Sequence, residues 1–242
     1  MNYLLMYLLG PQISWRTVFL IEYLGPLLIH PLILFARPYL YRNPTRNPLA
    51  KNQFPPPSDL QTLTCVLVAV HFVKRELETL LVHRFSSATM PFRNVFKNSA
   101  HYWLLSGILI AYFAYSPTAS AATQATSITS PIPLLGLALF AIGELGNLNA
   151  HLVLRGLRSS GGTERGIPHG LGFNWVTCPN YLFETIAWIG IWIVSRNWTV
   201  GAFLVFAVGQ MAIWAKKKEG RYRREFGDKY KRKRYAILPG IY

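Results

Sequence analysis

The chain has 242 residues, of which 51% are hydrophobic and only 14% are charged. Soluble domains usually carry about a quarter charged residues, so a water-soluble globular protein fits this composition poorly. The formal net charge is +15, from 25 Lys and Arg against 10 Asp and Glu. These basic residues stand in short runs between apolar stretches, which argues against a nucleic-acid-binding face and leaves membrane lipid or an anionic small ligand as the partner.

Six apolar segments follow one another along the chain, and a helix that crosses the hydrocarbon core needs about 20 such residues. The predicted spans are 17–36, 60–82, 99–115, 132–154, 181–194 and 198–215. Glu22, Pro26 and Pro31 interrupt the first span, and the later half of the second, HFVKRELETLLVHR, is heavily charged. We therefore predict an all-α fold: one membrane domain over 1–242, a polytopic bundle of about six helices with basic cytoplasmic loops and a basic C-terminal tail.

Basic residues accumulate on the cytoplasmic side of short membrane loops. The loop 155–166 and the tail KKKEGRYRREFGDKYKRKRY are basic, whereas the loop 116–131 has no charge. This asymmetry predicts that both termini are cytoplasmic. The segment 37–59 departs from the rule, and a re-entrant second span would remove the conflict. The departure comes from Arg37, Arg42, Arg46 and Lys51.

The two cysteines, Cys65 and Cys178, form neither a disulfide framework nor a metal-ligand spacing. We expect both to be reduced and without a catalytic role, and we expect no metal site. The start of the chain, MNYLLMYLLGPQISW, lacks the basic leader and small-residue cleavage site of a signal peptide. The Gly-rich segment 156–172 has neither the strand-then-helix context of a dinucleotide fingerprint nor a Walker spacing.

Polar side chains recur inside the apolar segments, where a charge costs about 2.5–3.5 kcal/mol on insertion scales and persists mainly beside a cavity or partner. Residues three or four apart share a helix face, which defines two stripes. The first stripe comprises Glu144, Asn147, His151, Arg155 and Arg158. The second stripe comprises Asn180, Tyr181 and Glu184. A single Asn or His would most simply bond two helices together, but two stripes that run toward the cytosol favour a polar pocket open to it.

Lys74 and Arg75, near the cytoplasmic end of the second span, allow two interpretations. Long basic side chains at such a position either extend to the membrane surface or contact a ligand. The residues alone leave both open.

Several motifs resemble a known family. GELGNLNAHLVLRGLR, IPHGLGF, VTCPNYLFETIAWIG, WAKKKEGRYRREFGDKY and ILPGIY resemble the C-terminal domain of steroid 5α-reductase-type membrane reductases. LGPQISWRTVFLIEYLGPLLIHP and HFVKRELETLLVHRFSSATMPFRNVFKNSAHYW resemble the very-long-chain trans-2-enoyl-CoA reductase branch of that family. The resemblance covers nearly the whole chain in order.

The resemblance implies an enzyme of the endoplasmic reticulum membrane that uses NADPH for the last reduction of the fatty-acid elongation cycle. A long-chain enoyl-CoA would be the substrate, and other elongation enzymes are possible partners. Tyr181, in the CPNY motif, would be the proton donor, and Glu22, Lys74 and Arg75 match positions required for activity. The cofactor set is Asn147, Arg158, Asn180, Glu184, Lys218 and Tyr222, with His151 and Arg155 added from the same stripe.

The chain departs from the family pattern at three places. We expect the soluble ubiquitin-like segment that usually opens this branch to be absent or removed here, because the chain starts just before the first span. The steroid enzymes tend to carry Asp at His151, which puts the role of His151 toward the cofactor in doubt. They carry Tyr at Phe72, which argues against a steroid substrate.

Four other functions stay open beside the enoyl-CoA reductase. Two are steroid and polyprenal reductases, which use the same hydride chemistry. The third is a membrane methyltransferase of the isoprenylcysteine type that uses S-adenosylmethionine. The fourth is a non-enzymatic lipid transporter or scaffold, although the internal repeat common in transporters is not found. Titration with NADPH separates the reductases from the last two.

Overall fold

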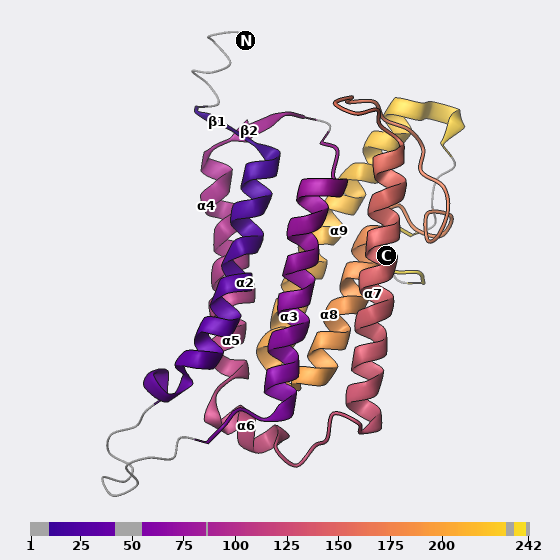
Figure 1. Ribbon diagram of the computed structural model, residues 1–242. Helices are drawn as coiled ribbons and strands as arrows, with labels where there is room; N and C mark the ends of the chain where they lie inside the picture. Colours follow the sequence, from indigo (N-terminus) through magenta and orange to yellow (C-terminus); the bar gives the residue numbers. More distant parts are fainter. Residues whose placement is uncertain (1–9, 42–54, 86, 231–234, 241–242) are drawn as a thin grey trace, which may run out of the picture.

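The computed structural model describes residues 10–41, 55–85, 87–230 and 235–240, and it is a bundle of long helices (Figure 1). The long helical segments are α2 (Trp15–Leu40), α3 (Asp59–Leu77) with the π-helical η1 (Glu78–Val82), α4 (Arg93–Ser99) with the π-helical η2 (Ala100–Leu109) and α5 (Ile110–Ala114), α7 (Pro131–Gly156), α8 (Pro179–Ser195) and α9 (Trp198–Phe226). Helix therefore occupies each of the six predicted ranges. The prolines of the first range do not break α2.

Residues that favour helix starts stand where these helices begin. Ser14 accepts a hydrogen bond from the Thr17 amide at the start of α2, and Ser58 forms a capping box with Gln61 at the start of α3. Asn197 accepts from the Thr199 amide at the start of α9. Such caps satisfy amide groups that have no partner inside the helix, so these starts follow from local sequence.

Short elements lie between the long helices. They are β1 (Gln12–Ser14), β2 (Thr89–Pro91), α6 (Pro117–Thr123) and the 3₁₀ turn η3 (Gly227–Lys229). The strands and the segment 157–178 lie at one end of the bundle, and α6 lies at the other (Figure 1). The segments predicted to be cytoplasmic thus share one end. Of the four basic residues in 37–59, Arg42, Arg46 and Lys51 fall outside the described residues, as do 231–234 of the tail.

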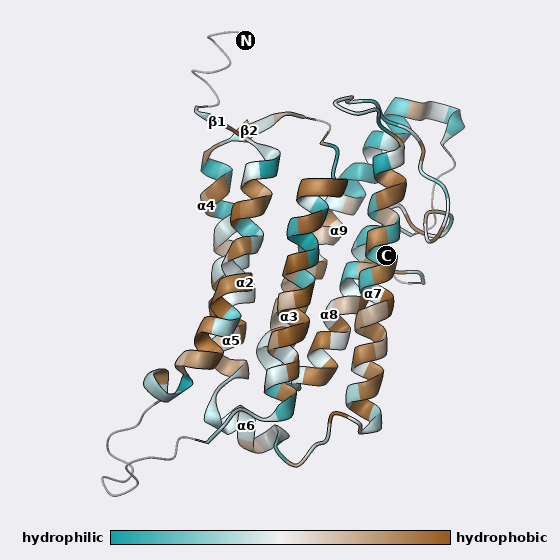
Figure 2. Cartoon of the chain, viewed as in Figure 1, coloured by the Kyte–Doolittle hydropathy of each residue, from teal (hydrophilic) through white to brown (hydrophobic). Residues whose placement is uncertain are grey.

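Three helical segments are long and apolar enough to cross a bilayer by length and composition: Trp15–Leu40, Pro131–Gly156 and Trp198–Lys229. Large apolar side chains are exposed along them, for example Leu32 and Phe35 on α2 and Val205 and Phe206 on α9. Figure 2 shows the hydrophobic residues along the middle of the bundle and hydrophilic ones toward the end that carries β1 and β2. This distribution suits a membrane protein, and the count of six crossings stays a prediction.

Glycines let α7 and α8 approach each other closely. A Cβ atom on Gly143 would lie 2.4 Å from the Ala187 backbone nitrogen, and one on Gly136 would lie 2.9 Å from the Gly190 carbonyl oxygen. Small residues at a membrane helix interface permit this approach. It brings the polar stripe of α7 against the start of α8.

Candidate active site

A cluster of ionisable side chains is buried where α3 faces α7 and α8. His71 on α3 lies between two carboxylates: its Nδ1 is 2.6 Å from Glu144 Oε1 on α7, and its Nε2 is 3.3 Å from Glu184 Oε1 on α8. Only 2% of the His71 side chain is exposed. Buried polar groups persist when partners compensate their lost hydration, and this pairing joins three helices at one point.

Lys74 lies one turn further along α3 and points into the bundle. Its Nζ donates a hydrogen bond to Asn147 Oδ1 at 2.6 Å and lies 3.0 Å from Glu78 Oε1 and 3.1 Å from Glu144 Oε2. The ammonium group thus donates to one amide oxygen and forms ion pairs with two carboxylates. Of the two interpretations of Lys74, extension to the membrane surface therefore does not hold in this structure.

Asn147 is the point at which the two predicted stripes meet. Its Nδ2 donates to the Asn180 carbonyl oxygen at 2.9 Å and to Glu184 Oε2 at 3.0 Å. The Oδ1 atom of Asn180 is buried and has no hydrogen-bond partner among the described residues. The structure thus brings together Asn147, Asn180 and Glu184 and leaves one buried acceptor there for a ligand.

Arg75 connects this cluster to α2. Its NH2 group donates to the Tyr23 hydroxyl at 2.8 Å, its guanidinium carbon is 5.0 Å from the centre of the Tyr23 ring, and its NH1 is 2.8 Å from Glu78 Oε2. Glu22, the neighbour of Tyr23, is buried, and its Oε1 has no hydrogen-bond partner in the described part of the chain. Glu22 and Arg75 therefore border the same polar region.

Tyr181 lies in the first turn of α8, where the helix dipole favours negative charge. Its ring is half-buried, with its centre 6.4 Å from that of Trp214 on α9. No described residue forms a hydrogen bond with the Tyr181 hydroxyl, which leaves its proton available to a ligand.

Lys218 and Tyr222 stand apart from this cluster on α9. Lys218 Nζ is 5.6 Å from the centre of the Tyr222 ring, and Tyr222 packs against Tyr230 with ring centres 5.3 Å apart. The Tyr230 hydroxyl donates to Glu219 Oε2, and burial together with this bond raises the pKa of Tyr230. Within the described residues, no hydrogen bond or ion pair joins Lys218 or Tyr222 to Asn147.

The C-terminal end of the first stripe, from His151 to Arg158, divides between two places. His151 belongs to the buried cluster, because its Nδ1 is 3.1 Å from Glu78 Oε2. Arg158 lies outside it and donates to the backbone carbonyl of Arg84. Arg155 lines an open cavity.

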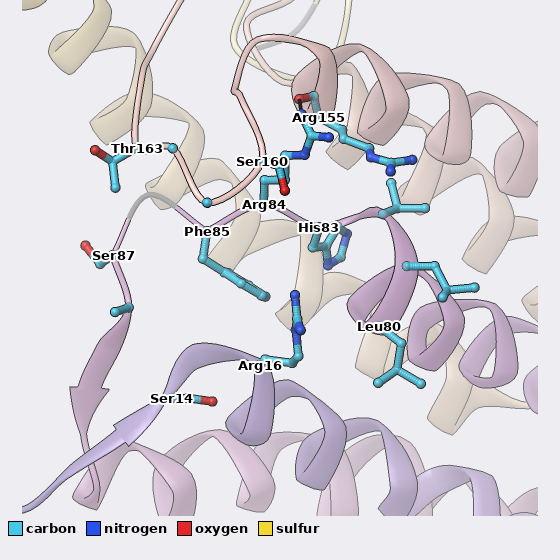
Figure 3. A pocket seen from close by; sticks show the side chains of 15 residues that line it. Ser14, Arg16, Leu80, His83, Arg84, Phe85, Ser87, Arg155, Ser160 and Thr163 are labelled. Atoms are coloured by element: carbon cyan, nitrogen blue, oxygen red, sulfur yellow. Dashed lines mark hydrogen bonds between the residues drawn. The ribbon is translucent and has the colours of Figure 1, made fainter.

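This cavity of about 520 Å³ lies between the start of α2, the end of η1 and the loop 160–163 (Figure 3). It adjoins the buried cluster at His83, which lines the cavity and whose ring centre is 4.8 Å from that of His151. Asn147, Asn180 and Tyr181 do not line it. The stripes therefore lead to a packed polar cluster with an open cavity beside it, where a single open pocket was predicted.

Glu78, His83 and His151 place one potential metal-ligand atom each within 4.8 Å of one another. Arg75 NH1 lies 2.8 Å from Glu78 Oε2 and 3.3 Å from His151 Nδ1. A guanidinium that binds these same atoms competes with a cation. The absence of a metal site stays a prediction.

Three residues of the cluster had no predicted place in the site: Tyr23, His71 and Glu78. Glu144 was predicted to lie on the first stripe, but no catalytic or cofactor role was assigned to it. A signal for His71 and Glu78 was present, because both follow helical spacing with Lys74. Tyr23 carried no signal, since one aromatic residue in an apolar span is ordinary. The contact with Arg75 alone reveals it.

The fold and the buried cluster thus define a helical membrane protein with a polar site inside the bundle, and comparison with known proteins gives its family. Residues 88–242 match the family model of 3-oxo-5-alpha-steroid 4-dehydrogenase. A Schizosaccharomyces pombe protein, by name an enoyl reductase, is 45% identical over 232 residues, which cover 96% of this chain and 73% of that protein. The very-long-chain enoyl-CoA reductase of Dictyostelium discoideum is 42% identical over 96% of this chain and 71% of its own length.

A more distant relative, the human trans-2,3-enoyl-CoA reductase-like protein, is 31% identical over 96% of this chain and 62% of its own length. The chain belongs to the 3-oxo-5-alpha-steroid 4-dehydrogenase family. It is an enzyme, an oxidoreductase of that family, and the resemblance inferred from its motifs is confirmed.

Proposed function

We propose that the chain reduces the trans-2 double bond of a very-long-chain enoyl-CoA with NADPH, the last step of the fatty-acid elongation cycle, in the endoplasmic reticulum membrane. One observation carries the proposal: Asn147 joins Lys74 on α3 to Asn180 and Glu184 at the start of α8, next to Tyr181. The names of the relatives support the substrate class.

The residues proposed to hold NADPH are Asn147, His151, Arg155, Arg158, Asn180, Glu184, Lys218 and Tyr222. The buried, unpartnered Oδ1 of Asn180 fits a carboxamide donor. The arginines at the cytoplasmic end suit phosphate, for which guanidinium offers a planar pair of donors. When bound, this cofactor supplies a hydride to Cβ of the enoyl thioester.

The chain's own residues handle the charge and the proton. Hydride addition at Cβ leaves negative charge on the thioester oxygen, and a proton at Cα completes the saturated product. Tyr181 donates that proton, and the first turn of α8 stabilises the phenolate left behind. Lys74 donates to Asn147, and Arg75 donates to Glu78 and Tyr23, so both are held in place as positive charges beside the site.

The family description raises the steroid reduction as a second candidate. Phe72 argues against it. Its ring is fully buried beside His71 and Trp188, with ring centres 4.9 and 6.3 Å away, and it has no hydroxyl to offer a steroid ketone.

Consumption of NADPH by the purified chain in detergent tests the proposal. We expect oxidation with a long trans-2-enoyl-CoA and much less with a 3-oxo-Δ4 steroid or with NADH in place of NADPH. Equal rates with the steroid would transfer the assignment to steroid reduction. Failure of NADPH to bind at all would favour a methyltransferase, or a lipid transporter or scaffold.

A further inference from the structure

The cavity beside the cluster is positively charged. Arg16 from α2, Arg84 from the segment after η1 and Arg155 from α7 line it, and no carboxylate is among the described residues that do so. Figure 3 shows Arg16 pointing into the hollow from one side, with Arg84 and Arg155 on the other. Its volume of about 520 Å³ falls within the range of roughly 300–1,000 Å³ usual for small-molecule sites.

Two local structures build these walls. The strands β1 and β2 pair antiparallel with Ser14 opposite Thr89, and the Trp15 amide donates to the Ala88 carbonyl, which holds Arg16 beside the segment after η1. On the other side a turn closes with a bond from the Gly162 amide to the Ser159 carbonyl. Gly161 has φ +76°, a conformation that glycine adopts without strain.

The charges of two arginines are available to a ligand. No described residue forms a hydrogen bond or ion pair with the side chain of Arg16 or of Arg155. Arg84 has a different role, because its guanidinium donates to the Arg158 carbonyl and holds two loops together. The nearby carboxylate of Glu164 accepts from the Ser159 hydroxyl at 2.7 Å, and this bond lowers the pKa of Glu164. Two arginines that line one cavity and whose guanidinium groups have no partner among the described residues are suited to phosphate.

The cavity also has an apolar side. Leu80 and Leu81 line it and are 49% and 67% exposed, and Leu77, one turn earlier, is 49% exposed. These exposed apolar side chains offer a surface on which an apolar chain can lie. A ligand that fits such a site has a phosphorylated head and a long apolar chain.

We propose that this cavity binds the phosphates of the coenzyme A part of the acyl substrate, with Arg16 as a specificity-determining residue. The inference rests on the proposed function, because an enoyl-CoA combines the required head and chain. His83 stands between the cavity and the cluster, 4.8 Å by ring centres from His151, so the cavity adjoins the side chains proposed to act on the thioester.

NADPH is the other phosphorylated adenine nucleotide of the reaction, and the structure favours it less here. Of the eight residues proposed for NADPH, only Arg155 lines the cavity. NADPH also has no apolar chain to place against Leu80 and Leu81. Arg155 is also among the residues proposed for NADPH, whereas Arg16, on the opposite side of the cavity, is not. A substitution of Arg16 therefore distinguishes binding of coenzyme A from binding of NADPH more clearly.

Equilibrium binding to the full chain in detergent tests the site without turnover. The ligands are coenzyme A and NADPH, and the variants are Arg16→Gln, Arg16→Lys and the control Arg93→Gln at an exposed arginine of α4 that does not line the cavity. We expect Arg16→Gln to raise the Kd for coenzyme A about tenfold, the effect of one lost charge-assisted hydrogen bond. Arg16→Lys should recover part of this loss, and NADPH should bind all three variants like the wild type.

Two results would overturn the inference: an unchanged Kd for coenzyme A in Arg16→Gln, or weaker binding of NADPH alone, which would give the cavity to the cofactor. Equal thermal midpoints of Arg16→Gln and Arg93→Gln show that both fold. Failure of the proposed function is separable. If the protein binds coenzyme A through Arg16 but does not reduce enoyl-CoA, the binding site is supported and the proposed function is wrong. If the protein reduces enoyl-CoA and Arg16→Gln leaves the Kd for coenzyme A unchanged, the proposed function is supported and the binding site is wrong.

Discussion

Lys74 Nζ on α3 and Asn147 Oδ1 on α7 are 2.6 Å apart, and the same ammonium stands about equally far from the carboxylates of Glu78 and Glu144. One cation thus lies between two acidic groups from different helical segments and fixes the orientation of an amide. That amide has its nitrogen turned to Asn180 and Glu184. The position of the first turn of α8 therefore depends on a charge carried by α3.

A double-mutant cycle on Lys74 and Glu144 measures this dependence. Lys74→Met leaves Glu144 with His71 as its partner, and Glu144→Gln leaves Lys74 with Glu78. Each change weakens the compensation of a buried charge and should lower the free energy of unfolding, by less than the roughly 3–5 kcal/mol that a wholly uncompensated charge costs. The double variant removes both charges and should lose at least about 1 kcal/mol less than the sum of the single losses. Unfolding in detergent followed by tryptophan fluorescence gives these values. Additive losses would mean that the two side chains do not interact.

Tyr181→Phe tests the proton donor. The variant keeps the ring that packs near Trp214 and removes only the hydroxyl. We expect NADPH to bind as before and turnover with enoyl-CoA to fall by about 10²–10⁴, the usual contribution of a positioned general acid. The control is Tyr39→Phe, since Tyr39 is 82% exposed on α2. Wild-type turnover in Tyr181→Phe would remove Tyr181 from the mechanism.

Asn147→Ala tests whether the connection between the stripes serves the cofactor. The change deletes the acceptor of Lys74 and the donor to Glu184, so the start of α8 loses its fixed position. We expect the Kd for NADPH to rise about tenfold or more, since each lost bond to a charged group costs about 1.5–3 kcal/mol. Fluorescence titration measures it, with Asn174→Ala, at an exposed loop residue, as the matched control. A Kd equal in the two variants would leave Asn147 with a structural role only.

Local sequence determines most of the helical layout. Ser14, Ser58 and Asn197 are residue types that favour helix N-caps, and each of them caps a helix here. Each predicted apolar range contains helix. The strands β1 and β2 escape such reasoning, because three-residue strands paired across more than 70 residues carry no local pattern. The uncharged loop 116–131 likewise contains α6. A stretch of Ser, Ala and Thr did not lead us to predict a helix there.

The site divides in the same way. Helical spacing groups Asn147 with His151 and Asn180 with Glu184, and the structure joins these groups. Spacing does not show that the charges of α3 would fill the region between them, because that depends on how closely the helices pack. Lys218 and Tyr222 were assigned to the cofactor from the family resemblance, and helical spacing does not relate them to Asn147. Among the described residues, no hydrogen bond or ion pair joins either of them to Asn147.

The close contact of α7 with α8 offers a final test, in which one substitution is made at two glycines of the same helix. A Cβ on Gly143 would meet the Ala187 backbone at 2.4 Å, whereas a Cβ on Gly156 would meet nothing within 4 Å. Gly143→Ala must therefore push the helices apart and should destabilise the protein by about 1–3 kcal/mol. Gly156→Ala should be neutral or stabilising by up to about 1 kcal/mol, because alanine restricts the unfolded chain. Thermal midpoints in detergent measure both changes. Because Asn147 lies one turn beyond Gly143, the first variant should also weaken NADPH binding, and equal midpoints and affinities in the two variants would show that this packing does not hold the site together.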